Sequence, residues 1–361
     1  MEDNSEQQLE RRKAALAHLG GIMAALGGGK EWPGHGCGLT QEEYQRLERA
    51  MQGAVRANGW YTMENVRHAF AAWGMALRPE ALDAWLARYP QLGEQKCAKV
   101  GLILAGNIPL VGLHDVICTW LAGHQAMVKP SSQEPELIPA LVKVLDVLHP
   151  GTADRIQIIP GKLGDVDAMI ATGSNNTARY FEHYFGHLPR IVRRNRVSVA
   201  VLDGTESEAE LTALGEDVFR YFGLGCRNVS KLFLPESFDL DRIFTAWYPY
   251  HEVVQHNKYA NNYDYTRAIW LLDQIPFLEN GFVLLKEDKA LASPVGAVFY
   301  ERYADKQVVE QRLKEHATEI QCVVGHDHLP FGTAQKPGLA DYADGVDTMR
   351  FLLELPQGQY S

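Results

Sequence analysis

The sequence predicts an α/β protein with doubly wound, mainly parallel sheets. Residues 97–132 read as strand, loop, helix and strand, and strand and helix patterns go on alternating after them. The chain of 361 residues is also longer than one average domain. We therefore expect a doubly wound α/β domain followed by a second α/β domain.

Composition limits the class of function. Hydrophobic residues make up 46% of the chain and charged residues 22%, which is typical of a globular protein. A net charge of −10 argues against a nucleic-acid partner, although a local basic pocket is compatible with it. Five cysteines without a CxxC pair favour a reducing compartment over a disulfide framework or a zinc site. With a polar N-terminus and no apolar run of membrane length, we expect a cytoplasmic protein with no membrane span. The cysteine spacing predicts that no metal is bound.

Residues 1–95 are expected to be helical. Apolar residues recur on one helical face between Leu9 and Met23, and a capping sequence begins at Thr40. Nothing in this region indicates chemistry. The hypothesis is an N-terminal helical layer packed on a sheet.

The first strand–helix–strand unit carries the first candidate site residues. A continuous apolar run at 100–105 predicts a buried strand, which ends at the polar turn 106–109. A helical pattern follows, and then a second strand at 125–129. Ligands in open α/β sheets bind beyond the carboxyl ends of the strands, which is where Asn107 and Lys129 lie.

The same alternation predicts a doubly wound domain over residues 96–204, with later strands at 155–159, 168–172 and 197–202. Gly173 and Ser174 follow one of these strands and begin a helix. Glycine permits close backbone approach, and the free N–H groups of a helix N-terminus suit a phosphate. The GxGxxG fingerprint is absent.

Cys226 is the candidate nucleophile. It lies between a Gly-containing turn and a strand, where backbone N–H groups are unpaired, and Arg227 and Lys231 are close in sequence. Positive charge and free amides lower the pKa of a thiol. The alternative is that Cys226 is a small buried apolar residue. The other four cysteines lie in helix-like or strand-like runs.

Residues 205–332 are expected to form the second domain, with the cysteine at its start and one of its strands at 268–272. His256 is either a proton donor or a hydrogen-bonded surface group. The spacing of the histidines in this segment does not suit a zinc helix. His326 and His328 are better explained by a solvated loop than by a metal site.

The tail at 333–361 is long and polar, and we expect it to return to the core or to form an oligomer interface. A final edge strand is expected at 346–353. The tail therefore predicts a homo-oligomer.

Taken together, residues 97–353 resemble the aldehyde dehydrogenase superfamily. They are closer to its acyl-CoA reductase branch, which includes the fatty acyl reductase that supplies aldehyde to bacterial luciferase. The resemblance rests on the order and spacing of five motifs: Gly106-Asn107-Ile108-Pro109, Val128-Lys129-Pro130-Ser131, Thr172-Gly173-Ser174, Gly225-Cys226-Arg227-Asn228 and Pro330-Phe331-Gly332.

The resemblance implies a Rossmann-like dinucleotide-binding domain over residues 96–204, an α/β catalytic domain over residues 205–332 and a set of roles. Cys226 would be the nucleophile and Asn107 the oxyanion donor. Lys129 and Ser131 would face the adenosine ribose, with Gly173 and Ser174 at the dinucleotide helix. His256 and Arg227 are candidates for proton transfer or substrate contact. The implied reaction is reduction of an acyl-CoA, in particular a fatty acyl-CoA, to the aldehyde with NADPH or NADH through a thioester on the cysteine.

Two departures from the family pattern bear on the reaction. The stretch 193–198 lacks the glutamate of hydrolytic aldehyde dehydrogenases, which favours exchange with CoA over attack by water. The stretch 291–295 keeps the proline of the ribose clamp but lacks its glutamate. The arginines at 190–196 either meet ligand phosphates or balance surface acids. A reductase of acyl phosphates and a non-catalytic scaffold with this fold remain as alternatives.

Overall fold

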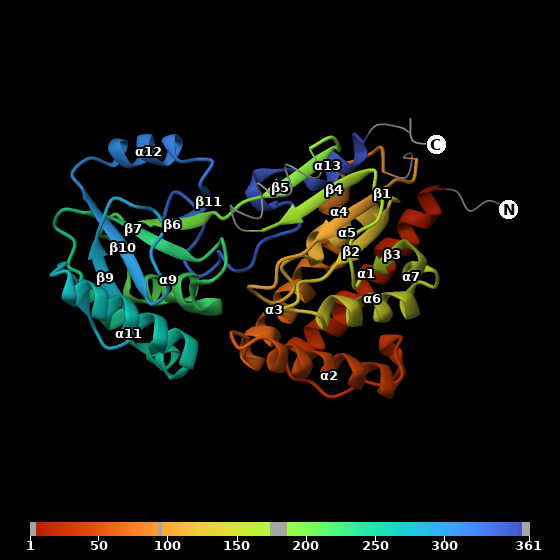
Figure 1. Cartoon of the computed structure of the whole chain (residues 1–361), viewed down its shortest axis with the longest axis horizontal. Helices are drawn as coiled ribbons and strands as arrows, with labels where there is room; N and C mark the ends of the chain where they lie inside the picture. The colour runs from red at the N-terminus through yellow and green to blue at the C-terminus, as the bar shows by residue number, and fades with distance from the viewer. Residues whose placement is uncertain (1–4, 93–95, 174–185, 356–361) are drawn as a thin grey trace. The chain divides into compact units, whose positions relative to one another are not determined.

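The computed structural model describes residues 5–92, 96–173 and 186–355. The chain divides into two compact units (Figure 1). The first consists of Met1–Arg194 together with Gly338–Ser361, and the second of Asn195–Pro337. Both are α/β, so the predicted fold class and the helical N-terminus are confirmed.

Helices form the N-terminal part of the first unit: α1 (Ser5–Gly27), η1 (His35–Cys37), α2 (Gln41–Ala57), α3 (Met63–Ala76) and α4 (Pro79–Leu86). The predicted capping box begins α2, because Thr40 accepts from the backbone N–H of Glu43 while the Glu43 side chain accepts from that of Thr40. Helix α1 packs along α3, and both α1 and α2 contact α6. The region is therefore a packed layer, as the periodicity predicted.

The first unit contains a five-stranded parallel sheet in the order β3-β2-β1-β4-β5. Its strands are β1 (Lys99–Ile103), β2 (Gln125–Lys129), β3 (Ile156–Ile158), β4 (Ala168–Thr172) and β5 (Arg190–Arg193). Between them run α5 (Leu113–Leu121), α6 (Leu137–Leu148) and α7 (Thr152–Arg155). Strand β1 lies in the middle, so the carboxyl ends of β1, β2 and β4 are neighbours at one edge of the sheet.

The C-terminal segment belongs to the first unit. It contains η4 (Ala343–Gly345) and α13 (Thr348–Leu353), and α13 packs on α5. The expected edge strand at 346–353 is therefore wrong. Asp347 caps α13 by accepting the backbone N–H of Arg350, and the buried Met349 and Leu352 are spaced for a helix.

The second unit contains a six-stranded sheet in the order β11-β6-β7-β10-β9-β8, parallel except for the β8–β9 pair. Its strands are β6 (Val197–Val201), β7 (Val229–Pro235), β8 (Leu278–Glu279), β9 (Leu284–Glu287), β10 (Ala297–Tyr303) and β11 (Ile320–Val324). The division between the units falls before β6, whereas the sequence analysis put a boundary after it, at 204. Strand β6 pairs with β7 and β11, and an apolar pattern does not reveal which sheet a strand joins.

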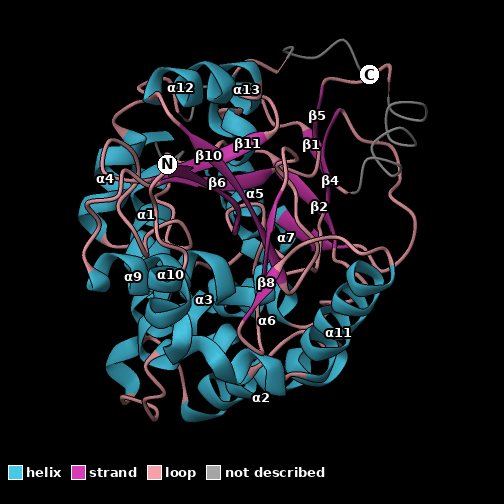
Figure 2. Ribbon diagram, turned by 90° about the vertical axis from the view of Figure 1, so that its left-hand side faces the viewer, coloured by secondary structure: helices cyan, strands magenta, loops and turns pink. Residues whose placement is uncertain are grey.

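Helices cover both faces of this second sheet: α9 (Glu208–Phe219), η2 (Arg220–Gly223), α10 (Asp241–Trp247), η3 (Tyr248–Gln255), α11 (Asn257–Leu272) and α12 (Lys306–Glu315). Alternate residues of β6 face opposite sides, since Val199 packs with Val309 of α12 whereas Ala200 packs with Leu214 of α9. Figures 1 and 2 show α12 on one side of β6 and β10 and α9 on the other. The strand expected at 268–272 is wrong, because this segment completes α11.

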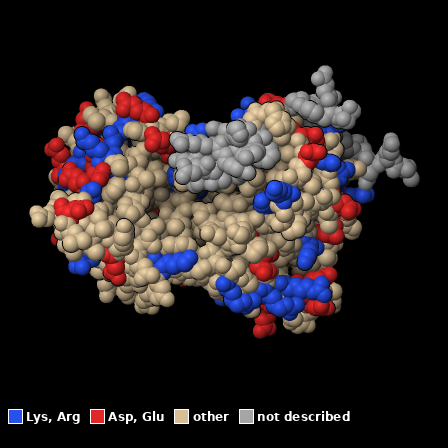
Figure 3. All heavy atoms as spheres, viewed as in Figure 1, with Lys and Arg blue, Asp and Glu red and all other residues tan. Residues whose placement is uncertain are grey.

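Charges on the visible surface are mixed in sign. Figure 3 shows acidic and basic side chains side by side over α12 and its surroundings. Lys306 pairs there with Asp327, and Arg312 with Glu301. Among the described residues, no helix combines the length and the apolar character needed to cross a bilayer.

Candidate active site

Cys226 lies in the turn that joins η2 to β7, with its side chain half-buried. Three consecutive residues before it have left-handed backbone angles: Tyr221 (φ 54°), Phe222 (φ 58°) and Gly223 (φ 77°). Each non-glycine residue with left-handed backbone angles costs roughly 1–2 kcal/mol of conformational free energy. Strain of this kind persists only where surrounding contacts over-determine the backbone, and it is common at functional sites.

Asn228 supplies those contacts, and the sequence analysis did not give it a role of its own. Its buried side chain donates from Nδ2 to the carbonyl oxygen of Arg220 at 2.6 Å and to those of Asp217 and Val218 at 3.3 Å each. Its Oδ1 accepts the N–H of Gly225, directly before the cysteine, at 2.8 Å. One amide thereby closes the end of α9 and fixes the turn. An asparagine in a turn is a weak signal for such a contact.

Ser198 of β6 holds the other side of the cysteine. Its Oγ donates to the Cys226 carbonyl at 2.9 Å and lies 3.1 Å from the Cys322 sulfur. Burial raises the pKa of the Cys322 thiol, while the hydrogen bond with Ser198 and the positive charge of Arg227 act in the opposite direction. Nothing in the sequence pattern singles out Ser198, because its partners come from two other segments of the chain.

His256 lies against the same turn. Its ring stacks on Phe222 with a centroid distance of 4.1 Å, and its Nδ1 accepts the Tyr259 backbone N–H at the start of α11. The proton of the neutral ring is therefore on Nε2. The structure thus brings His256 to the cysteine turn, while its part in proton transfer stays a prediction.

A cavity of about 360 Å³, open solvent included, adjoins the turn. Its lining includes Phe222, Gly223 and Asn228 together with Ser293 and Pro294. The stretch that the sequence analysis compared with a ribose clamp therefore faces the candidate nucleophile's own turn.

The 330–334 segment is fastened to α9 by Asp217. The carboxylate of this buried residue accepts the N–H of Gly332 at 2.6 Å and that of Ala334 at 2.9 Å. Burial raises the pKa of Asp217 to about 6, although the two N–H groups favour the ionised form. The Pro330-Phe331-Gly332 motif and the cysteine turn thus share one helix as their support.

In the first unit, the turn after β1 brings Asn107 to the carboxyl edge of the sheet, half-buried. A Cβ atom on Gly106 would lie 2.7 Å from the Ser131 hydroxyl, so this position needs glycine. Ser131 follows β2, which ends at Lys129, and Leu104 donates to the Lys129 carbonyl at 3.1 Å. Three of the predicted site residues therefore lie at neighbouring strand ends.

Gly173 follows β4, the other neighbour of β1, and its N–H points to the Arg193 carbonyl at 3.4 Å. Ser174, predicted as the phosphate-binding start of a helix, lies outside the described residues. Gly173 thus lies at the same sheet edge as Lys129 and Ser131.

Arg193 fits neither expectation for the 190–196 arginines. It is buried, and its Nη2 lies 2.6 Å from Asp115 of α5 and 2.8 Å from the Thr348 hydroxyl. Against the effect of desolvation, the charge of Asp115 raises the pKa of Arg193. This arginine ties the C-terminal segment to the first sheet.

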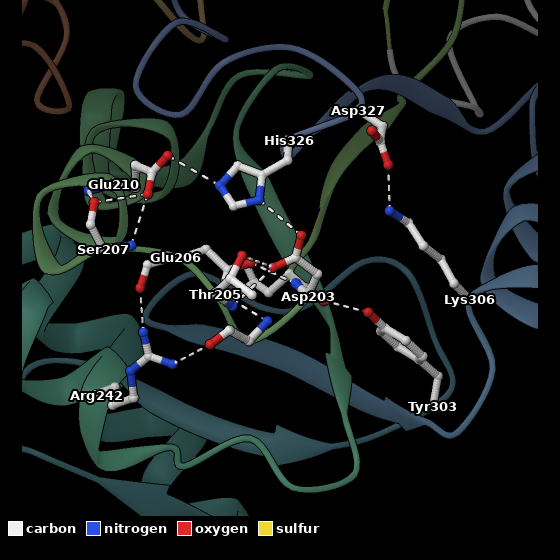
Figure 4. Close-up of polar contacts among 12 residues, drawn as sticks. Asp203, Thr205, Glu206, Ser207, Glu210, Arg242, Tyr303, Lys306, His326 and Asp327 are labelled. Carbon is white, nitrogen blue, oxygen red and sulfur yellow. Dashed lines mark hydrogen bonds and ion pairs between the residues drawn. The ribbon is translucent and has the colours of Figure 1, made fainter.

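A His–carboxylate cluster lies on the loops after β6 and β11 (Figure 4). His326 bridges the two carboxylates: its Nδ1 is 2.9 Å from Asp203 and its Nε2 is 3.1 Å from Glu210. The buried Glu206 accepts the backbone N–H groups of Asp203 and Gly204 at 2.6 and 3.0 Å. Each of these groups is satisfied by protein partners, so the cluster is a hydrogen-bonded clasp between two loops.

This clasp predicts a pH-dependent stability. Hydrogen bonds to Asp203 and Glu210 raise the pKa of His326, so the protonated ring stabilises the fold below about pH 6.5 and this contribution is lost as the pH rises through the folded pKa. Burial tends to raise the pKa of Asp203, but hydrogen bonds from Thr205 and His326 lower it further than burial raises it. The contribution of ionised Asp203 to stability is therefore lost only in acid. His326→Gln should lower the melting temperature more at about pH 5.5 than at about pH 8.5.

The control is His251→Gln, since His251 is an exposed histidine whose Nδ1 contacts a backbone carbonyl. Its melting temperature should follow that of the wild type at both pH values. An equal loss for His326→Gln at both pH values would contradict the role of the charged ring.

Comparison with known proteins now adds to this geometry. The family described as acyl-CoA reductase (LuxC) matches residues 74–241, just under half of the chain. No curated protein sequence matches significantly. Among solved structures, an oxidoreductase from Marinobacter aquaeolei is similar, with 13% identity, a TM-score of 0.61 and coverage of 88% of this chain and 73% of that one.

Two further solved structures are similar over most of both chains. Aldehyde dehydrogenase 21 from Physcomitrella patens has 14% identity and a TM-score of 0.59, with 88% of this chain and 74% of that one covered. The NAD-dependent benzaldehyde dehydrogenase from Corynebacterium glutamicum has 13% identity and a TM-score of 0.56, with 89% and 78% covered. The chain therefore has the aldehyde dehydrogenase fold, and its residues 74–241 match the acyl-CoA reductase family that its motifs resemble.

Proposed function

We propose that the protein reduces acyl-CoA thioesters, with fatty acyl chains as the main class, to aldehydes through a thioester on Cys226. The observation that carries the proposal is the turn around this cysteine. Its backbone is strained, and Asn228 and Ser198 hold it from both sides. The acyl-CoA reductase match, which includes this turn, supports the choice of substrate.

NADPH or NADH is the proposed reductant. Lys129 and Ser131 offer an ammonium group and a hydroxyl at the carboxyl edge of a parallel sheet, where dinucleotides bind in such folds. Gly173 follows β4, which lies on the other side of β1 from β2. The similar benzaldehyde dehydrogenase is NAD-dependent, which supports a nicotinamide cofactor. When bound, the cofactor supplies a hydride to the thioester carbon.

In the first half-reaction, the Cys226 sulfur attacks the thioester carbonyl carbon. A carbon–sulfur bond to Cys226 forms, the bond to CoA breaks, and the thiol proton leaves with the CoA sulfur. The Asn107 side-chain amide and a backbone N–H beside Cys226 donate to the carbonyl oxygen as it becomes negative. A well-placed donor of this kind contributes roughly 3–4 kcal/mol.

In the second half-reaction, the carbonyl carbon held on Cys226 is reduced and its oxygen takes up a proton. The hydroxyl proton then passes to the sulfur as the carbon–sulfur bond breaks, aldehyde leaves and the thiol is restored. His256 is the proposed proton donor, because its ring lies on the cysteine turn and its neutral form carries the proton on Nε2.

Hydrolysis of the enzyme-bound thioester is not expected. Residues 193–198, which correspond to the stretch with the general base in hydrolytic relatives, contain no acid. Arg193 pairs there with Asp115, and Arg196 donates to the carbonyls of Ala317 and Ile320. An enzyme that cannot activate water at this point passes the acyl group between Cys226 and CoA.

The test is the oxidation of NADPH and NADH in the presence of a series of acyl-CoAs, beside acyl phosphates of the same chains. We expect consumption that depends on acyl-CoA, releases one CoA thiol per turnover and has a preferred chain length. Turnover with acyl phosphates but not with acyl-CoAs would contradict the proposed substrate and identify the protein as a reductase of acyl phosphates. Dinucleotide binding without turnover on either series would contradict the proposal in favour of a scaffold.

A further inference from the structure

The N-terminal helical layer reaches the turn that carries Asn107. Two of its side chains donate to the same acceptor, the carbonyl oxygen of Gly106. The Asn58 Nδ2 lies 2.8 Å from this oxygen and the Tyr61 hydroxyl 3.2 Å. Both donors are buried, with 4% and 5% of their surface exposed. A doubly satisfied carbonyl in the interior has one well-defined orientation.

The two donors are themselves held rigidly. Asn58 follows α2, where its N–H donates to the Ala54 carbonyl at 3.0 Å. Its Oδ1 accepts the N–H of Trp60 at 2.9 Å, and its carbonyl accepts the N–H of Tyr61, also at 2.9 Å. The short connection between α2 and α3 is therefore a fixed platform.

The other side of the Gly106 turn is equally confined. The space that a Cβ on Gly106 would need is occupied by the Ser131 side chain. Further along the turn, Leu110 is buried in a left-handed conformation with φ of 62°. Such a residue keeps its conformation only if its surroundings enforce it.

The Gly106 carbonyl and the Asn107 N–H belong to one planar peptide group. Fixing the carbonyl therefore fixes the plane from which Asn107 begins. Acyl transfer is sensitive to such placement, because an error of about 1 Å in a reacting group can cost about 100-fold in rate.

We propose that Asn58 and Tyr61 are positioning residues for the catalytic amide of Asn107, so that the N-terminal helical layer is part of the reductase machinery. This proposal rests on the proposed function, since it gives Asn107 its role as oxyanion donor. It also assigns a task to a region in which the sequence pattern indicated no chemistry.

The test compares Asn58→Ala and Tyr61→Phe with the wild type in acyl-CoA reduction. We expect kcat to fall about 10-fold to 100-fold for Asn58→Ala and about 3-fold to 10-fold for Tyr61→Phe, with the KM for the dinucleotide unchanged. Tyr61→Phe removes one oxygen only, so it remains informative if Asn58→Ala folds poorly.

Tyr44→Phe is the matched control. Tyr44 is a buried tyrosine of the same helical layer whose hydroxyl donates to the Lys30 carbonyl at 2.8 Å, away from the Asn107 turn. Its removal costs the protein a similar hydrogen bond and should leave kcat within about 2-fold of the wild type. An equal fall in kcat for Tyr44→Phe and Tyr61→Phe would overturn the positioning role.

A double-mutant cycle separates positioning from general damage. If Asn58 acts through Asn107, adding Asn58→Ala to Asn107→Ala should change kcat less than about 2-fold. Losses that multiply in the double variant would overturn the proposal while leaving the thioester chemistry intact.

Hydrogen exchange distinguishes failure of the positioning role from failure of the proposed function. Amides of residues 104–112 should exchange faster in Asn58→Ala than in Tyr44→Phe, whichever substrate the enzyme uses. Wild-type protein without acyl-CoA turnover would contradict the proposed function. Unchanged exchange in Asn58→Ala would contradict the positioning role.

Discussion

Replacement of Cys226 by alanine is expected to abolish acyl-CoA reduction, with kcat lower by roughly 10⁴-fold to 10⁶-fold, the scale seen when an enzyme loses its nucleophile. In the proposed mechanism, a thioester on this sulfur divides the reaction into an acyl transfer and a hydride transfer. Wild-type enzyme incubated with acyl-CoA alone should release one equivalent of CoA and gain the mass of one acyl group. Mass spectrometry of the intact protein detects the acyl adduct in the wild type and should find none in Cys226→Ala.

The control for this experiment is Cys97→Ala, since Cys97 is an exposed thiol of the first unit. This variant should keep the acyl adduct and the turnover of the wild type. An acyl adduct or residual fast turnover in Cys226→Ala would show that another group is the nucleophile. Loss of dinucleotide binding is not expected in either variant, because neither cysteine lies at the carboxyl edge of the first sheet.

The second large effect concerns stability and is expected at Arg193. Its side chain and that of Asp115 are 6% and 5% exposed, and the guanidinium also donates to the Ala343 carbonyl at 2.7 Å and to Thr348. Arg193→Ala leaves Asp115 as a buried carboxylate without its counter-ion. Breaking one side of a buried pair costs about 3–5 kcal/mol. Denaturant unfolding should record this loss as a lower midpoint.

Arg190→Ala is the matched control, because Arg190 begins the same strand but is exposed and contacts the Gly186 carbonyl. Its effect should stay within about 0.5 kcal/mol. A double variant, Arg193→Met with Asp115→Leu, should regain much of the stability, since two apolar side chains leave no buried charge. A stable Arg193→Ala protein would mean that the C-terminal segment does not depend on this pair.

Local pattern was sufficient for much of the fold. The apolar run after Cys97 became β1, and residues 125–129 and 168–172 became β2 and β4 with the predicted limits. Helix or strand was harder to choose at short apolar segments. Residues 268–272 contain an isoleucine and a tryptophan typical of strands, yet Tyr263, Thr266 and Trp270 are buried at helical spacing, and tertiary packing selected the helix.

The sequence by itself determined that a cysteine in a Gly-containing turn and an asparagine after the first buried strand were the residues to examine, because both signals are local. Only the tertiary structure decided what holds them. Asn58 reaches Gly106 across 48 positions of the chain, and Ser198 reaches Cys226 across 28. Both side chains donate hydrogen bonds to backbone carbonyls. Every residue has such a carbonyl, whatever its side chain, so no local sequence pattern identifies the partner before the chain has folded.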